Sequence, residues 1–184
     1  MLMAARIFWI TGPWPGRLGI APRPRGAEWL DDETRAWRKA GIDAVVSLLE
    51  PAEEAELDLR GEPASSKASG LTFHAFPIPD RGIPRSPEAV GEVADQIVGA
   101  LRSGKTVVVH CRQGIGRSAM MVAAALIAGG LTAETAVNAI RQSRGLEVPE
   151  TEAQRQWISD FSAWLSSARA AQQQHQVDGA SRRR

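Results

Sequence analysis

The residues with the clearest chemical potential surround Cys111, the only cysteine of the chain. A cysteine thiolate is a strong nucleophile, and Arg117, six positions later, can hold two oxygens of a phosphate in a bidentate fork. Gly114 and Gly116 allow the intervening backbone to turn its N–H groups inward, which forms a nest for an oxyanion and favours the thiolate near neutral pH. The spacing therefore predicts an anion-binding loop with a nucleophile at its base.

The other residues of this loop can support the same chemistry. Ser118 can donate a hydrogen bond to the sulfur, which makes the sulfur a better leaving group. His110 is expected to order the loop through its ring N–H rather than to act as a base. The anion would be held by the loop amides and the guanidinium of Arg112, Gln113, Gly114, Ile115, Gly116 and Arg117. A buried, inert cysteine beside a tight turn is the alternative interpretation.

The segment resembles the signature H-C-x5-R-[ST] of the cysteine-dependent protein phosphatases. More narrowly, it is similar to the small dual-specificity group that includes kinase-associated phosphatase and bacterial enzymes. The resemblance implies an acid on an upstream loop, and Asp80 in the Pro-rich segment before Arg81 and Gly82 matches it. Asp80 would protonate the leaving oxygen and then take a proton from the attacking water. A turn residue that caps its own loop is the other interpretation of Asp80.

The resemblance also implies a glutamine that positions the hydrolytic water, and Gln154 matches it, with Gln156 as an alternative. Catalysis is expected to need no cofactor. Three histidines and one cysteine at these spacings make no metal site, so it is also expected to need no metal.

The function that the resemblance implies is hydrolysis of phosphotyrosine through a phosphocysteine intermediate, with phosphoserine and phosphothreonine as further substrates. The partner would be a phosphorylated protein or peptide. A phosphoinositide phosphatase is an alternative, since Arg112 keeps one positive charge where those enzymes carry lysine. A rhodanese-like sulfurtransferase is a second alternative, but that family needs no residue equivalent to Arg117 or Asp80, so the presence of both argues against it. A phosphopeptide-binding pseudophosphatase is a third alternative, although such proteins usually lose the cysteine, the arginine or the acid.

The composition fits one soluble enzyme domain. The chain has 184 residues, 43% of them apolar and 23% charged, which is ordinary for a globular protein. A net charge of +1 gives no reason to expect nucleic acid as a partner. No apolar run reaches signal-peptide or membrane-span length, and a single thiol suits a reducing compartment, so a cytoplasmic location without membrane insertion is expected. The oligomeric state is left open.

The elements around the loop must place the nucleophile at the end of a strand and the arginine at the start of a helix. Residues 106–109 are a β-branched run typical of a buried strand, and residues 119–128 form an apolar run typical of a helix. Backbone N–H groups at such a helix start are unpaired and favour an anion. The alternation of strands and helices along the chain predicts an α/β domain with three layers, in which helices flank a mostly parallel sheet.

The remaining pattern completes this arrangement. Residues 61–70, rich in small and polar types, are expected to form a loop. The last helix, capped by Thr151, is expected to end near Ala168, so that residues 1–168 form the phosphatase domain and residues 169–184 a disordered tail. Further strands are expected at 6–10, 17–21, 44–49 and 71–76, and further helices at 28–39, 51–59, 86–102 and 132–143.

Overall fold

Strand β5 (Thr106–Cys111) lies at the centre of a five-stranded sheet of order β1-β2-β5-β3-β4. Strands β2 (Arg17–Pro22) and β3 (Ala44–Ser47) both pair with β5 in parallel. Strand β4 (Thr72–Ala75) continues the parallel set, and β1 (Phe8–Ile10) adds an antiparallel edge. The computed structural model describes residues 6–181. Every residue of β5 is buried, as the β-branched run predicts for a central parallel strand.

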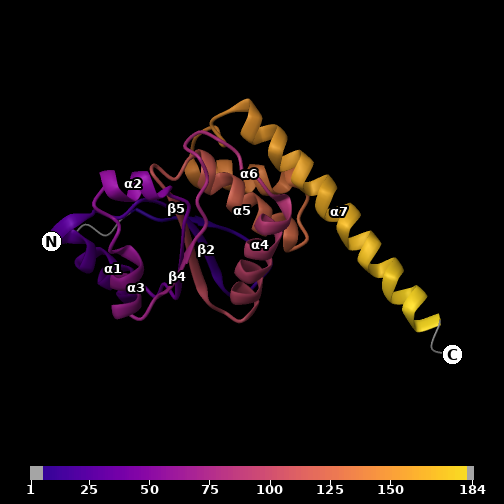
Figure 1. Cartoon of the computed structure of the whole chain (residues 1–184), viewed down its shortest axis with the longest axis horizontal. Coiled ribbons are helices and arrows are strands. Elements are labelled where there is room, and N and C mark those ends of the chain that lie inside the picture. Colours follow the sequence, from indigo (N-terminus) through magenta and orange to yellow (C-terminus); the bar gives the residue numbers. More distant parts are fainter. Residues whose placement is uncertain (1–5, 182–184) are drawn as a thin grey trace.

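Helices cover both faces of the sheet, which confirms the expected three-layer α/β fold (Figure 1). On one face, residues of α4 and α5 share a core cluster with Val107 and Val109 of β5. On the other face, Trp37 of α1 packs with Val108. The helices are α1 (Leu30–Lys39), α2 (Pro51–Glu56), α3 (Glu62–Ala68), α4 (Pro87–Arg102), α5 (Gly116–Ala128), α6 (Ala133–Arg144) and α7 (Glu152–Ser181).

Helix α5 carries Arg117 and Ser118, two of the residues that the sequence analysis singled out. It begins at Gly116, earlier than the apolar run at residues 119–128 predicts, and every one of its residues is buried. Arg117 and Ser118 therefore lie in its first turn, where unpaired backbone N–H groups point toward the preceding loop. The loop between β5 and α5 is short, because the strand ends at Cys111 and the helix begins at Gly116.

The prediction of a loop at residues 61–70 is wrong, because residues 62–68 form helix α3. Pro63 lies in the first turn, where the missing N–H of proline does no harm. The serines that favoured a loop are used in packing instead, since the hydroxyl of Ser65 lies 2.8 Å from that of Thr34 in α1 and is buried with it. Ser65 also donates to Asp31 at 2.6 Å. Tertiary hydrogen bonds thus override the local preference of serine for turns.

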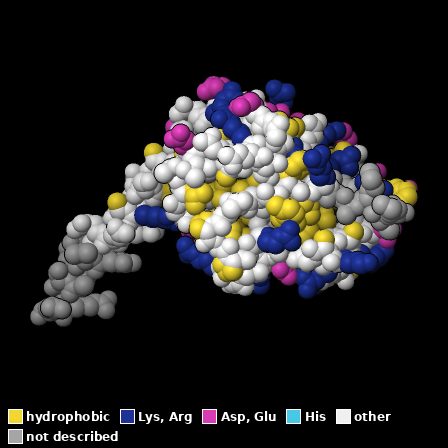
Figure 2. All heavy atoms as spheres, turned by 180° about the vertical axis from the view of Figure 1, so that it is seen from behind, with side chains coloured by type: hydrophobic (Ala, Val, Ile, Leu, Met, Phe, Trp, Pro, Cys, Tyr) yellow, Lys and Arg dark blue, Asp and Glu magenta, His cyan; other side chains and the backbone are white. Residues whose placement is uncertain are grey.

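Helix α7 continues to Ser181 instead of ending near Ala168. Residues 169–181, expected to be disordered, are helical in the structure, which fits their content of alanine and glutamine. The C-terminal part of α7 projects from the body of the protein (Figures 1 and 2). Residues 182–184 lie outside the described residues, and the division into a domain and a tail stays a prediction. From residue 6 to residue 181, no helix has both the length and the apolar character needed to cross a membrane.

Asp43 connects the end of α1 to the start of β5, and it provides a test of the fold. Its carboxylate accepts hydrogen bonds from the backbone N–H of Thr106 at 2.9 Å and from Arg38 at 2.7 Å. The Thr106 bond and then the Arg38 bond hold the pKa of Asp43 below its ordinary range.

We expect Asp43→Ala to lower the free energy of unfolding by about 1 kcal/mol at pH 7. Because the pKa of Asp43 is lower in the folded state, its contribution is present above about pH 4 and is lost as the pH falls through the folded value. Thermal melting of both proteins at pH 7 and at about pH 3 checks this. An equal difference in melting temperature at the two pH values would contradict the prediction.

Candidate active site

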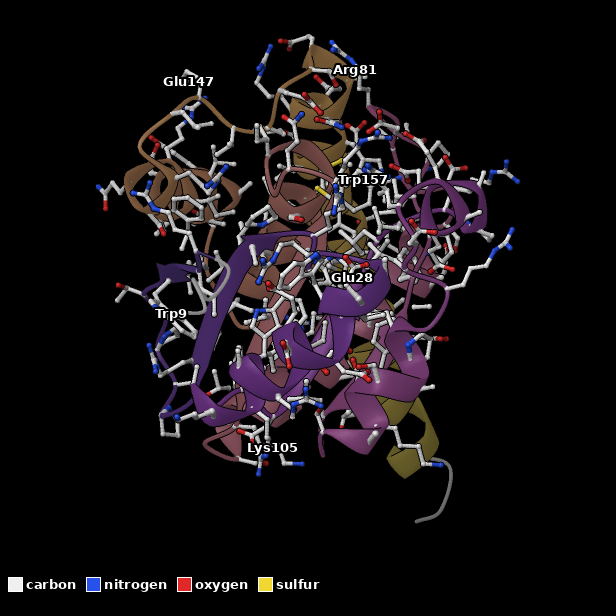
Figure 3. All side chains as sticks on the ribbon, turned by 90° about the vertical axis from the view of Figure 1, so that its left-hand side faces the viewer. Trp9, Glu28, Arg81, Lys105, Glu147 and Trp157 are labelled. Carbon is white, nitrogen blue, oxygen red and sulfur yellow. The ribbon has the colours of Figure 1, made fainter. Side chains whose placement is uncertain are left out.

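The loop between β5 and α5 folds around the sulfur of Cys111. The backbone N–H of Gly114 donates to Sγ at 3.3 Å, and the cysteine is buried. Gly114 has a φ of +67°, and a Cβ atom there would lie 2.6 Å from the carbonyl oxygen of Ala21. Only glycine fits this position, because both the backbone conformation and the close approach exclude a side chain. Arg81 and Lys105 lie toward opposite ends of the molecule in Figure 3, and the site is at the Arg81 end.

Arg117 is buried and bound by a carboxylate that the sequence analysis missed. Its Nη1 donates to Oε2 of Glu53 at 2.6 Å and its Nη2 to Oε1 at 2.9 Å, which makes a bidentate pair. Nη1 also donates to the carbonyl oxygen of Ile78 at 3.1 Å. The only signal for Glu53 in the sequence is its place in an acidic run just after a strand. Helix α2 thus supplies the group that fixes the guanidinium.

Burial and ion pairing act in opposite directions on this pair. Burial tends to lower the pKa of Arg117, but the hydrogen bonds of Glu53 and the charges of Cys111, Glu53 and Asp80 outweigh it and raise that pKa. Burial tends to raise the pKa of Glu53, and the hydrogen bond from Arg117 outweighs it and lowers that pKa. Both groups are therefore charged at neutral pH.

Asp80 lies where the resemblance implies an acid. Its Oδ1 is 2.8 Å from Nη2 of Arg117, and 53% of its side chain is exposed. The backbone N–H of Asp80 donates to Oε2 of Glu50 at 3.4 Å, which connects the acid loop to the start of α2. The carboxyl group is thus held beside the guanidinium and still open to solvent. A group in this position can exchange protons with water and with a bound ester.

The pocket above the sulfur has a volume of about 170 Å³. This is smaller than the roughly 300–1,000 Å³ of pockets that enclose a drug-sized ligand, so it suits a small anion whose substituent extends outward. Among residues 6–181, no three side chains of metal-binding types are grouped so that they could hold an ion. The pocket is lined by Asp80, Arg81, Cys111, Arg112, Gln113, Ile115, Gly116, Arg117 and Glu150.

Of the two glutamines considered, Gln154 is the one that lies beside Gly116, a residue that lines the pocket. Gln154 is fully buried, and its Nε2 donates to the carbonyl oxygen of Gly82 at 3.1 Å. A Cβ atom on Gly116 would lie 2.6 Å from Oε1 of Gln154 and equally close to Oε1 of Glu150. Gln156 is exposed and donates to Asp160 at 2.9 Å instead. Glu150 is a second pocket carboxylate that the sequence analysis did not single out.

Ser118 and His110 are both buried, but they differ in their contacts. The hydroxyl of Ser118 has no hydrogen-bond partner in the part of the chain that the structure describes, so the expected bond to the sulfur is not formed here. Nε2 of His110 lies 2.9 Å from Oε1 of Glu62 in α3. His110 therefore contacts the helical layer behind the sheet rather than the pocket.

The other loop residues point in different directions. Arg112 forms an exposed ion pair with Glu56, with nitrogen–oxygen distances of 2.6 and 3.3 Å. The carbonyl oxygen of Gln113 accepts a bond of 3.5 Å from Arg144 of α6. Ile115 packs against the main core cluster. The side chains of Arg112 and Ile115 and the carbonyl oxygen of Gln113 thus anchor the loop through three separate contacts, and the same three residues line the pocket.

Comparison with known proteins identifies the family. The family model described as "Polymorphic toxin system, DSP-PTPase phosphatase" matches residues 19–131, which include Asp80, Cys111 and Arg117. The chain belongs to this family. The resemblance to small cysteine-dependent phosphatases that the motif indicated is thus confirmed.

Solved structures and curated proteins that resemble this chain agree with the family assignment. Tk-PTP, solved in its active form, is 31% identical in sequence to this chain, with a TM-score of 0.66 over 80% of this chain and 92% of that one. Kinase-associated phosphatase has the same fold, with a TM-score of 0.82 at 19% identity over 90% of this chain and 98% of that one. Cyclin-dependent kinase inhibitor 3 of Rattus norvegicus is 28% identical over 104 residues, 53% of this chain and 49% of the relative. The chain spans about half the length of the curated relatives it matches.

The buried pair of Arg117 and Glu53 provides a test of the site. We expect Glu53→Gln to lower the free energy of unfolding by about 3 kcal/mol, because it leaves a buried cation with only part of its compensation. Adding Arg117→Met should cost less than the two single changes together, since the double variant has no unpaired charge. Urea denaturation of the three variants measures this coupling.

The matched control is Asp32→Asn, which removes an exposed carboxylate paired with Arg35. It should leave the denaturation midpoint nearly unchanged. Strictly additive effects of Glu53→Gln and Arg117→Met would show that the pair is not a coupled unit.

Proposed function

We propose that this chain is an active phosphatase that hydrolyses phosphate monoesters on proteins through a phosphocysteine intermediate. Phosphotyrosine is the preferred substrate, and phosphoserine and phosphothreonine are further substrates. The observation that carries the proposal is the convergence of three groups on one small pocket, namely the sulfur of Cys111, the guanidinium of Arg117 and the carboxyl group of Asp80.

In the first step, the thiolate of Cys111 attacks phosphorus in line with the leaving oxygen. The sulfur–phosphorus bond forms as the bond to the leaving oxygen breaks, and Asp80 donates its proton to that oxygen. The loop amides and Arg117 hold the other phosphate oxygens. Phosphoryl transfer depends mainly on positioning and charge stabilisation, so this small set of groups is sufficient.

In the second step, water attacks the phosphocysteine. Oε1 of Gln154 accepts a hydrogen bond from this water, and the bond from Nε2 to Gly82 keeps the amide oriented for that purpose. Asp80 takes the proton, the sulfur leaves as a thiolate and inorganic phosphate is released. Ser118 assists by turning its unpaired hydroxyl toward the sulfur.

A protein substrate is favoured by the site and by the relatives. The pocket encloses little more than the phosphate, so the rest of the substrate contacts the rim, where Arg81 and Arg112 lie. One matched relative is a probable protein tyrosine phosphatase type IVA A of Dictyostelium discoideum, 38% identical over 81 residues, which cover 42% of this chain and 48% of the relative. The same proposal puts the chain in the cytoplasm, because a catalytic thiolate works where thiols stay reduced.

Hydrolysis of p-nitrophenyl phosphate in reductant and chelator is the first test. We expect turnover by the wild type and a loss of at least about 10³-fold in Cys111→Ser, which keeps phosphopeptide binding because the loop amides and Arg117 remain. Phosphopeptide binding without any turnover by the wild type would instead indicate a binding module. Sulfur transfer from thiosulfate to cyanide would indicate a sulfurtransferase.

A second test separates the two pocket carboxylates. With an alkyl phosphate, whose leaving group needs a proton, Asp80→Asn should lower kcat about 10²-fold or more, and with a good aryl leaving group the loss should be smaller. Glu150→Gln should retain most activity on both esters. The reverse ranking would move the acid role from Asp80 to Glu150.

A further inference from the structure

The three arginines that line the pocket differ in how their charges are compensated. Arg117 is paired with two carboxylates of the chain, and Arg112 is paired with one. Arg81 has no hydrogen bond, ion pair or ring contact within the described part of the chain. It is exposed and lies at the end of the molecule where the pocket is (Figure 3). Its guanidinium is therefore free to bind an anionic group that comes from outside the chain.

Arg81 is also held in a backbone conformation that does not suit an arginine. Residues 79–82 form a β-turn, in which the carbonyl oxygen of Pro79 accepts a hydrogen bond of 2.8 Å from the N–H of Gly82. Arg81 is the third residue of this turn and has a φ of +56°. A positive φ at this position favours glycine or asparagine, because a larger side chain is crowded against the backbone. An arginine here is unfavourable for folding, and strain of this kind is concentrated at functional sites.

The turn that carries Arg81 is fixed on both sides by other parts of the chain. The backbone N–H of Asp80 donates to the carboxylate of Glu50 at 3.4 Å. The carbonyl oxygen of Gly82 accepts a hydrogen bond of 3.1 Å from the amide of Gln154. These contacts hold the backbone of Arg81 in its place at the pocket before any ligand arrives. A ligand that binds the guanidinium therefore has only the side chain to order, which reduces the entropy lost on binding.

The group that Arg81 meets in a bound substrate lies outside the phosphate. In the proposed mechanism the loop amides and Arg117 hold the phosphate oxygens, and a pocket of about 170 Å³ encloses little more than that group. Asp80, the neighbour of Arg81, donates its proton to the leaving oxygen, which belongs to the phosphorylated residue. Arg81 therefore lies beside the peptide that flanks this residue. The anionic side chains of a peptide are carboxylates, which a guanidinium binds through two parallel hydrogen bonds.

We propose that Arg81 is a specificity-determining residue that binds a substrate carboxylate next to the phosphorylated residue, so that the site selects acidic phosphopeptides. The inference rests on the proposed function, since it requires a phosphopeptide in the pocket. Arg112 lines the same pocket, but its guanidinium is already bound to Glu56 at 2.6 and 3.3 Å. A substrate carboxylate that approached Arg112 would have to displace that partner, whereas Arg81 binds it without such an exchange.

Binding of two matched phosphotyrosine peptides tests the proposal. One peptide carries glutamate on each side of the phosphotyrosine and the other carries glutamine, and calorimetry on Cys111→Ser protein gives both dissociation constants without turnover. We expect the acidic peptide to bind about fivefold more tightly, as one well-aligned exposed ion pair allows. Arg81→Gln should reduce this preference to less than about twofold, and the ratio cancels any effect common to both peptides.

Two further variants control this result. Arg85→Gln removes another exposed arginine of the same loop, which does not line the pocket, and it should keep the preference of the parent protein. Arg81→Glu should reverse the preference, so that a peptide with lysine at the flanking positions binds more tightly than the acidic one. A preference for the acidic peptide that persists in Arg81→Gln would overturn the proposal.

Thermal melting distinguishes a residue kept for the substrate from one kept for the fold. Arg81→Gly removes both the guanidinium and the crowding at positive φ, whereas Arg81→Ala removes only the guanidinium. We expect both variants to lose the peptide preference and Arg81→Gly to melt at or above the temperature of the parent protein. If Arg81→Gly melted well below it, Arg81 would serve the fold and the proposal would be wrong.

Failure of this inference and failure of the proposed function give different results. Turnover of both peptides by the wild type, with no preference that depends on Arg81, would remove the inference and leave the phosphatase. A preference that depends on Arg81 in a protein without turnover would support the inference for a phosphopeptide-binding module. Absence of binding of either peptide would overturn both proposals.

Discussion

The buried charge of Arg117 is the constraint on which the rest of the site depends. A guanidinium withdrawn from water needs compensation from every direction, and three parts of the chain supply it. Helix α2 contributes the carboxylate of Glu53. The loop that carries Asp80 contributes the carboxylate of that residue and the carbonyl oxygen of Ile78. The segment after β3 contributes the carbonyl oxygen of Leu48, which accepts a hydrogen bond of 3.5 Å from Arg117. Neutralising the Arg117 cation thus brings together the segments that form the proposed phosphate-binding site.

The sequence predicted the parts of the site that follow from local pattern. The strand, the loop and the helix around Cys111 are contiguous, so their residue types alone indicate an anion-binding turn. Asp80 and Gln154 are implied by the resemblance; in the structure Asp80 lines the pocket, and Gln154 lies buried beside Gly116. The choice between Gln154 and Gln156 depends on burial, because both lie near the start of one helix and local pattern does not distinguish them.

The carboxylates Glu53, Glu62 and Glu150 could not be predicted in the same way. Each acquires its place through tertiary contact, and an acidic residue in a short helix or turn is ordinarily a solvated one. Glu62 was further obscured because Ser65 and its neighbours favour a loop in isolation. In each case the local sequence pattern gives no information about the residues that the carboxylate contacts, because these residues lie elsewhere in the chain.

Under the proposed function, the ion pair between Asp80 and Arg117 means that a carboxylate of the protein itself occupies a position that the phosphate of a substrate would take. Arrival of a substrate at Nη2 is then an exchange of a carboxylate for a phosphate, and the field within the pocket changes less than it would in an empty seat. When inorganic phosphate leaves, the carboxylate of Asp80 can pair with Arg117 again, because it is tethered nearby at a high effective concentration. If Asp80 is the acid, as proposed, its competition for the guanidinium of Arg117 also limits how tightly the phosphate product is retained.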